Sequence, residues 1–293
     1  MSRNVLKIAC ILCLIALIAC GALILGNVFH IGLRYANAEK YAAGAATVEG
    51  AVKNLDIHWR DGSVKIAYHD KDTVEISETS PKAIPDKAAL RWWLDGDTLR
   101  VQYAKSGFFS FWGQKKALTV TLPEGTAITD LGIDVTSGEI DLDQPTAVDS
   151  VRLACTSGDI RAALPDVKAL AIEATSGDIQ ASFKSADSVS LSTTSGEIDA
   201  EGESAGTAKV DCTSGDIRLH LDAFDELRID TTSGDVTAAL PTEPGYRARV
   251  ATTSGSFNAD VPLSKDGDEY LCGDGSGRVE IQVTSGDVRL TEE

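Results

Sequence analysis

A short polar motif, Thr-Ser-Gly, recurs eight times between residues 136 and 286. Its threonine falls at positions 136, 156, 175, 194, 213, 232, 253 and 284, so the steps are 20, 19, 19, 19, 19, 21 and 31 residues. Repetition at such a period is typical of folds in which each unit buries its apolar face only against its neighbours. This motif constrains the fold more than any other feature of the sequence.

Apolar residues alternate with polar ones on both sides of each motif. In residues 170–183 the predicted inward side chains are Leu170, Ile172 and Ala174, then Ile179, Ala181 and Phe183. Alternation with a period of two indicates half-buried strands. Neighbouring units hold apolar residues in the same slots: Val151, Leu153, Cys155, Ile160, Ala162 and Leu164 in one, and Ala208, Val210, Cys212, Ile217, Leu219 and Leu221 in another.

The repeat predicts an all-β fold, a parallel β-solenoid whose rungs of about 19 residues stack roughly 4.8 Å apart. A sandwich of antiparallel hairpins is the alternative, but it would not require one turn sequence to recur. Stacking in register favours a recurring turn sequence, because every rung then needs the same corner. Glycine supplies the positive φ of such a corner; the candidates are Gly138, Gly158, Gly177, Gly196, Gly215, Gly234, Gly255 and Gly286.

A carboxylate follows every one of these glycines except Gly255, which precedes Ser256. In a stack the carboxylates form a row, and two interpretations stay open. Each carboxylate can bind the corner amides, a structural role. Alternatively, the row can bind Ca²⁺ through oxygen ligands, with a candidate ladder at Asp159, Asp178, Glu197, Asp216 and Asp235. No other cofactor is predicted.

The solenoid divides into two parts. Residues 131–293 form the regular repeat, in which 262–278 lengthen one return and are expected to cap the end of the stack. Residues 48–130 are an irregular N-terminal part. It begins with a degenerate unit whose inward side chains are predicted to be Leu55, Ile57, Trp59, Val64, Ile66 and Tyr68.

An uncharged apolar run, residues 8–29, precedes the repeat. About 20 such residues span a bilayer as a helix, and Arg3 and Lys7 place the N-terminus, 1–7, in the cytoplasm. The sequence therefore predicts a single-pass anchor in the cell membrane, a linker over 30–47 and an extracytoplasmic C-terminal domain. Lipidation at Cys20 after cleavage and secretion after signal-peptide cleavage are the alternatives.

Charge excludes one class of partner. The chain carries a net charge of −17, and residues 41–293 hold 23 basic and 43 acidic side chains. A domain with a net charge of −20 repels nucleic acid, so no nucleic-acid binding is expected. Four histidines without a nucleophile at informative spacing give no support to an enzyme.

One loop, 105–116, sets Phe108, Phe109, Phe111 and Trp112 among lysines. Aromatic residues flanked by cations suit a membrane interface or a ligand surface. Equally, such residues can close the side of an apolar core. Both interpretations stay open.

The serial TSGD and TSGE corners, the strand around "LDIHWRDGSVKI", the "ALTVTLP" strand and the closing "YLCGDGSGRVEIQVTSGDVRL" resemble a bacterial β-strand-repeat family. That family is named "putative adhesin" and is a domain of unknown function. The resemblance covers roughly 48–290 and implies a β-helical envelope domain without agreed catalytic or binding residues.

The function expected from the sequence is a membrane-anchored, non-catalytic envelope interaction module, adhesin-like in character. Its candidate partners are surface glycans, envelope proteins and other copies of itself. The alternative is a regulatory or sensing ectodomain of an envelope stress pathway that acts through a membrane partner.

Overall fold

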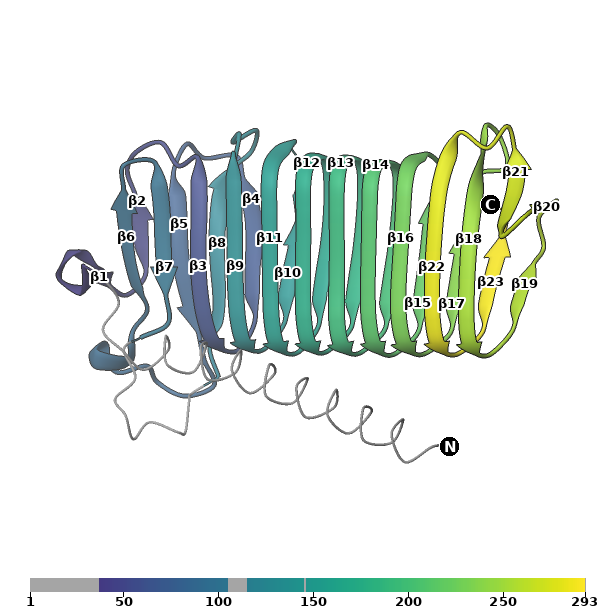
Figure 1. Cartoon of the computed structure of the whole chain (residues 1–293). Coiled ribbons are helices and arrows are strands. Elements are labelled where there is room, and N and C mark those ends of the chain that lie inside the picture. The colour runs from purple at the N-terminus through teal and green to yellow at the C-terminus, as the bar shows by residue number, and fades with distance from the viewer. Residues whose placement is uncertain (1–36, 105–114, 145, 293) are drawn as a thin grey trace, which may run out of the picture.

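The computed structural model describes residues 37–104, 115–144 and 146–292. In this part of the chain, 23 strands form one sheet that winds into a β-solenoid, with parallel pairing between its rungs and antiparallel strands at its two ends (Figure 1). The prediction of an all-β solenoid is confirmed. The apolar run 8–29 lies outside the described residues, and none of the helices within them is long and apolar enough to cross a membrane.

Each regular rung has a strand segment that enters a Thr-Ser-Gly corner and one that leaves it; β12, β13 and β14 are continuous and each leaves one corner and enters the next. The strands of this region are β9 (Asp130–Ser137), β10 (Ile140–Asp143), β11 (Val148–Ser157), β12 (Ile160–Ser176), β13 (Ile179–Ser195), β14 (Ile198–Ser214), β15 (Ile217–Leu221), β16 (Phe224–Ser233) and β17 (Val236–Ala239). Parallel pairing follows the 19-residue period, so Ile160 lies beside Ile179 and Ile179 beside Ile198. We call the two sides of the stack the entry face and the exit face, after the strands that enter and leave the corners.

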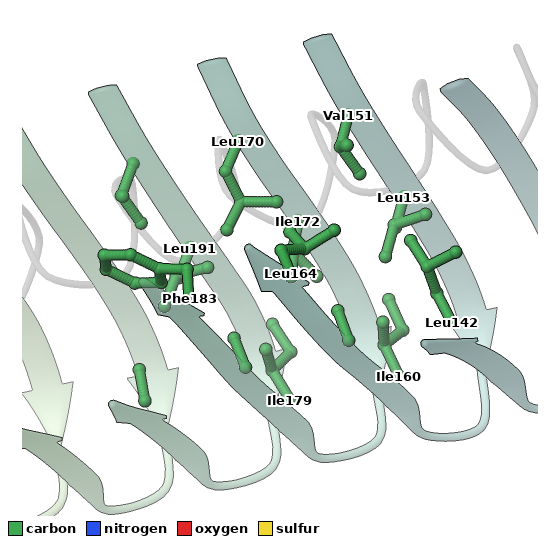
Figure 2. Close-up of a cluster of buried hydrophobic side chains, with 14 of the residues drawn as sticks. Leu142, Val151, Leu153, Ile160, Leu164, Leu170, Ile172, Ile179, Phe183 and Leu191 are labelled. Carbon is green, nitrogen blue, oxygen red and sulfur yellow. The ribbon is translucent and has the colours of Figure 1, made fainter. Parts of the chain in front are cut away.

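The core lies between these two faces. All eighteen inward side chains predicted for three of the regular units are buried. Figure 2 shows part of this core and labels Leu170, Ile179 and Phe183 among others. In the first unit, Leu55, Ile57, Trp59, Val64 and Ile66 are also buried, whereas Tyr68 is half-buried. Stacking of equal rungs therefore produces one continuous apolar interior.

The corner glycines pack directly on one another along the stack. The φ angles of all eight lie between 131° and 149°, a region that side chains other than glycine rarely adopt. A Cβ added at any of the eight would lie 1.9–2.1 Å from the carbonyl oxygen of the adjacent rung's glycine. The amide of Gly177 donates to the carbonyl of Ser195 over 2.9 Å, so the rungs are bonded at their corners as well as along their strands.

The N-terminal end of the solenoid is closed by antiparallel strands. It comprises two 3-10 turns, η1 (Ala38–Lys40) and η2 (Asp86–Ala88), and the strands β1 (Ala42–Ala43), β2 (Ala46–Val48), β3 (Asn54–Asp61), β4 (Val64–His69), β5 (Val74–Thr79), β6 (Arg91–Asp95), β7 (Thr98–Gln102) and β8 (Ala117–Pro123). The rung of β3 and β4 lies inside, against β9 and β10. The rung of β7 and β8 lies outside it, and β6 and β5 pair antiparallel with these two strands.

At the C-terminal end, too, the order of two rungs along the stack differs from their order in the sequence. Its strands are β18 (Gly245–Ser254), β19 (Phe257–Ala259), β20 (Ser264–Asp266), β21 (Glu269–Gly273), β22 (Gly277–Ser285) and β23 (Val288–Thr291). The last rung in the sequence, β22 and β23, is inserted between the rung of β16 and β17 and the rung of β18 and β19. Within the predicted cap 262–278, β21 pairs antiparallel with β18.

The order of rungs along the stack thus differs from their order in the sequence at both ends. At each end two rungs are exchanged, and the segment that joins them passes over the outside. That segment supplies β5 and β6 at one end and β20 and β21 at the other. An exposed parallel edge invites pairing with another chain. The joining segments cover the outer edges of β7, β8 and β18 with strands already attached.

The described residues of the predicted linker over 30–47 begin at Asn37. Residues 42–43 form β1, which pairs antiparallel with β6, and residues 46–48 form β2, which pairs antiparallel with β5. The same antiparallel covering of the end explains why these residues join the sheet.

Replacing Gly196 by Ala is expected to lower the free energy of unfolding by about 3 kcal/mol or more, because positive φ and a steric clash both oppose the methyl group. The measurement is a urea titration followed by circular dichroism.

Gly267 provides the matched control, since its φ is +63° but a Cβ there meets nothing within 4 Å. Gly267→Ala should therefore cost only about 1 kcal/mol, from its backbone alone. Equal losses at the two positions would contradict the close packing of corners proposed here.

Candidate functional site

The carboxylates that follow the corner glycines do form one row, and the aspartates in it bind the next rung. Asp159 accepts the backbone N–H of Asp178 over 3.0 Å, and Asp178 accepts that of Glu197 over 2.8 Å. Further along, Asp216 accepts the N–H of Asp235, and Asp235 that of Asp287. Each of these carboxylates therefore satisfies an amide that the corner leaves exposed.

The two glutamates of the row behave differently from the aspartates. Glu197 pairs with Arg218 of the next rung at 2.6 Å, and Glu139 lies 3.8 Å from Arg161. Within the described residues neither accepts an amide of the adjacent corner. The longer side chain of glutamate carries its charge past the amide to an outward arginine, so Asp and Glu are not equivalent here.

The row ends at Ser256 for a geometric reason. Because the last rung of the sequence is inserted before it, the rung that contains Ser256 is the outermost regular rung of the stack. Asp287 accepts both the backbone N–H and the hydroxyl of Ser256, at 2.7 and 2.9 Å, which lowers the pKa of Asp287. A carboxylate at position 256 would have no further corner amide to accept.

The calcium interpretation of the row gains nothing from this geometry. The candidate ladder residues Asp159, Asp178, Glu197, Asp216 and Asp235 lie on successive rungs, but their oxygens contact amides or arginine. No group of three or more His, Cys, Asp or Glu in the part of the chain that the structure describes could hold a metal ion.

Asp178→Ala is expected to lower the free energy of unfolding by about 1 kcal/mol, the usual contribution of one such hydrogen bond. Asp199→Ala, which removes an outward carboxylate from the rung of Glu197, should change it by less than about 0.5 kcal/mol. The losses should be the same in EDTA and in calcium, as measured by thermal unfolding. A calcium-dependent loss at Asp178 would establish the metal interpretation instead.

Two grooves run along the outside of the stack. The larger, of about 500 Å³, lies on the entry face beside the corners and is lined by three consecutive positions on each of several rungs. Its lining residues are Ala174, Ser192, Thr193, Thr194, Asp211, Cys212, Thr213, Asp230, Thr231, Thr232, Ala251, Thr253, Gln282, Val283 and Thr284. We call it the threonine groove, because five of these threonines are those of the repeated motif.

Charges in the threonine groove are balanced locally. Asp211 pairs with Lys209 at 2.6 Å, and Asp230 pairs with Arg228 at 2.7 Å. Arg228 also reaches Glu280 on the adjacent rung, at 2.8 Å. The groove therefore presents rows of hydroxyl groups with paired charges beside them. Sequence reasoning missed it, although the outward threonine of every motif was the available signal.

The smaller groove, of about 390 Å³, lies on the exit face. Small side chains, Ala163 and Ser182, leave it open, while Asp141 and Asp143 flank it at one end and Asp199 and Glu201 at the other. It spans four rungs, so both grooves follow the axis of the stack.

The histidines do not combine into a catalytic group in the described residues. His58 Nε2 lies 3.0 Å from Asp56, and that hydrogen bond raises the pKa of His58. His69 instead contacts the carbonyl of Thr73 at 2.6 Å. The two side chains are therefore engaged separately.

The aromatic residues of the predicted interface loop, Phe108, Phe109, Phe111 and Trp112, lie outside the described residues. Lys116, the last residue of the segment 105–116, occupies the position of a corner glycine: its N–H donates to the carbonyl of Asp61 over 3.0 Å, and a Cβ added to Gly62 would lie 2.2 Å from its carbonyl oxygen.

A buried ion pair lies beneath this position. Lys116 and Glu78, whose side chains are only 1% and 5% exposed, pair at 2.6 Å. Lys116 also donates to the carbonyl of Ala88, and Glu78 accepts the N–H of Leu90. Burial lowers the pKa of Lys116. The pair ties the end strands to the first corner.

Lys116→Met is expected to destabilise the fold by about 3–5 kcal/mol, because it leaves the Glu78 carboxylate buried and unpaired. The double variant Lys116→Met with Glu78→Leu should recover part of this loss, the rest being the unsatisfied N–H of Leu90. Urea unfolding of both variants measures the difference. A double variant no more stable than the single one would count against the charge as the cause.

Comparison with known proteins gives a family. A family model described as Toastrack DUF4097 matches residues 52–291, whereas no protein of curated function matches. A solved "putative adhesin" from Bacteroides fragilis is 11% identical, covers 86% of this chain and 97% of its own, and has a TM-score of 0.45. Another from Parabacteroides merdae is 13% identical, with coverages of 86% and 96% and a TM-score of 0.42. The match to the family model spans most of the sequence, and the chain belongs to the Toastrack DUF4097 family.

Proposed function

We propose that this protein is a membrane-anchored, non-catalytic module that binds an extended polymer of the cell envelope outside the cytoplasmic membrane. The observation that carries the proposal is the threonine groove, which repeats the same hydroxyl groups on successive rungs. An extended polymer can meet such a surface at several equivalent points. Surface glycan is the polymer chemistry that hydroxyl groups and paired charges suit best.

Two features of the sequence and structure support the remaining parts of the proposal. The uncharged run 8–29 is long enough to span a bilayer, which supports anchoring and an extracytoplasmic position for the solenoid. Elsewhere, the ionisable groups are used in pairs and in amide contacts, as at Asp178 and Arg228. Their engagement in structure supports a binding role over a catalytic one.

The test is co-sedimentation of the full chain, held in lipid nanodiscs, with purified bacterial cell walls. Saturable binding is expected. Thr213→Lys together with Thr232→Lys places two bulky cations in the threonine groove and should reduce the bound fraction several-fold. Thr207→Lys is the matched control, because Thr207 is exposed on the same strand as Thr213 but lies outside the groove.

Each other outcome has a definite meaning. Equal binding by the groove and control variants would place the contact elsewhere on the solenoid. If no binding is seen with or without calcium, the proposal of a polymer-binding module is rejected. The regulatory alternative, an ectodomain that acts on a membrane partner, is then favoured. That alternative predicts that in-cell cross-linking captures one specific membrane protein.

A further inference from the structure

Charge is distributed unevenly along the solenoid. Among the described residues, 41–123 hold 10 basic and 10 acidic side chains, whereas 124–292 hold 12 basic and 32 acidic ones. The first set builds the N-terminal end, and the second builds the rest of the stack (Figure 1). One end of the molecule is therefore neutral, and the remainder is strongly negative.

The neutral end presents aromatic rings with one lysine over them, beside the exposed Glu39 of the same turn. The exposed Lys40 in η1 places its ammonium 4.5 Å from the ring centroid of Trp93 on β6. Tyr41 packs edge-on against the same ring at 5.7 Å, and its hydroxyl accepts from Gln102. Tryptophan, tyrosine and lysine are the residue types enriched where proteins meet the headgroups of a bilayer. We call Lys40, Tyr41 and Trp93 the end surface.

Chain length brings the end surface close to the predicted anchor. Seven residues, 30–36, separate the apolar run from Asn37, and fully extended they reach about 25 Å. Twelve strands lie side by side along the entry face, from β6 to β21. At the usual strand spacing this makes the stack roughly 50 Å long. The far end can therefore stand well clear of a membrane that the near end touches.

We propose that the solenoid docks on the anionic lipid surface of its own membrane through the end surface and holds its acidic rungs away from that surface. The proposal rests on the anchoring part of the proposed function. The potential of anionic headgroups falls off within a Debye length of about 8–10 Å. The neutral end can enter this layer, while the acidic rungs are repelled by it if the solenoid lies flat. The grooves, which follow the axis of the stack, then extend away from the membrane into the rest of the envelope.

The experiment measures how near each end lies to the bilayer. The full chain is reconstituted into vesicles of phosphatidylcholine with phosphatidylglycerol, or of phosphatidylcholine alone, each with an acceptor dye on a lipid headgroup. A donor dye is attached through Glu49→Cys near the end surface or through Asp268→Cys at the far end. Both positions are exposed, and the three cysteines of the described residues are buried. The chain without an added cysteine gives the background.

In phosphatidylglycerol vesicles at low salt, energy transfer is expected to be several-fold stronger from position 49 than from position 268. Transfer from 268 should rise when salt is added or phosphatidylglycerol is omitted. Lys40→Glu should weaken transfer from 49. Its matched control is Lys265→Glu, which removes a lysine that lies over the ring of Tyr270 at the far end; it should leave transfer from 49 unchanged.

Equal transfer from the two positions at low salt, or no effect of Lys40→Glu, would overturn the docking. Extraction of the vesicles with alkaline carbonate separates this failure from failure of the anchor. A chain released by carbonate is not anchored, and the proposed function loses its membrane part. A chain that stays embedded while both ends give equal transfer refutes only the docked orientation.

Discussion

The approach of one corner glycine to the next is the contact on which the rest of this structure depends. A carbonyl oxygen occupies the space that a Cβ would need at all eight positions. Only glycine therefore fits at these corners, and their contact fixes the distance between neighbouring rungs. From that spacing follow the register of the strands, the single core between the two faces and the row of carboxylates that reach the next rung's amide. The grooves follow as well, since they exist only because equal side chains are placed at equal heights.

In the middle of the stack every rung pairs with a rung on each side, but the two end rungs each leave one edge unpaired. At both ends the chain adds antiparallel strands to that edge. At the N-terminal end both strands of the outer rung, β7 and β8, pair with strands of the connection, whereas at the C-terminal end β21 pairs with β18 alone. The closing strands run antiparallel, so a short connection is enough. At the N-terminal end the buried pair of Lys116 and Glu78 strengthens this closure with charge. The cost of burying that pair is acceptable only because both partners have further hydrogen bonds.

Much of the fold could be predicted from the sequence, because a period of 19 residues and alternating apolar positions leave few alternatives. The inward slots of Leu170, Ile179 and Phe183 were predictable in this way. The exchange of rungs was not, since the step of 31 residues before Thr284 fits a long return in sequence order equally well. The roles of the carboxylates were only partly predictable. Aspartate and glutamate look equivalent in a motif, but a single methylene decides whether the carboxylate reaches an amide or an arginine.

Each rung whose row residue is an aspartate accepts the corner N–H of the rung ahead, as Asp159 and Asp178 do. A unit such as 160–178, which begins after one such aspartate and ends with the next, could therefore be duplicated or lost without altering what its neighbours require. The terminal rung, with Ser256, accepts nothing further, so growth of the row stops there whatever the number of units before it. Array length in this architecture is thus free to change in evolution by whole rungs. The length of the solenoid could change in this way while its two ends stay the same.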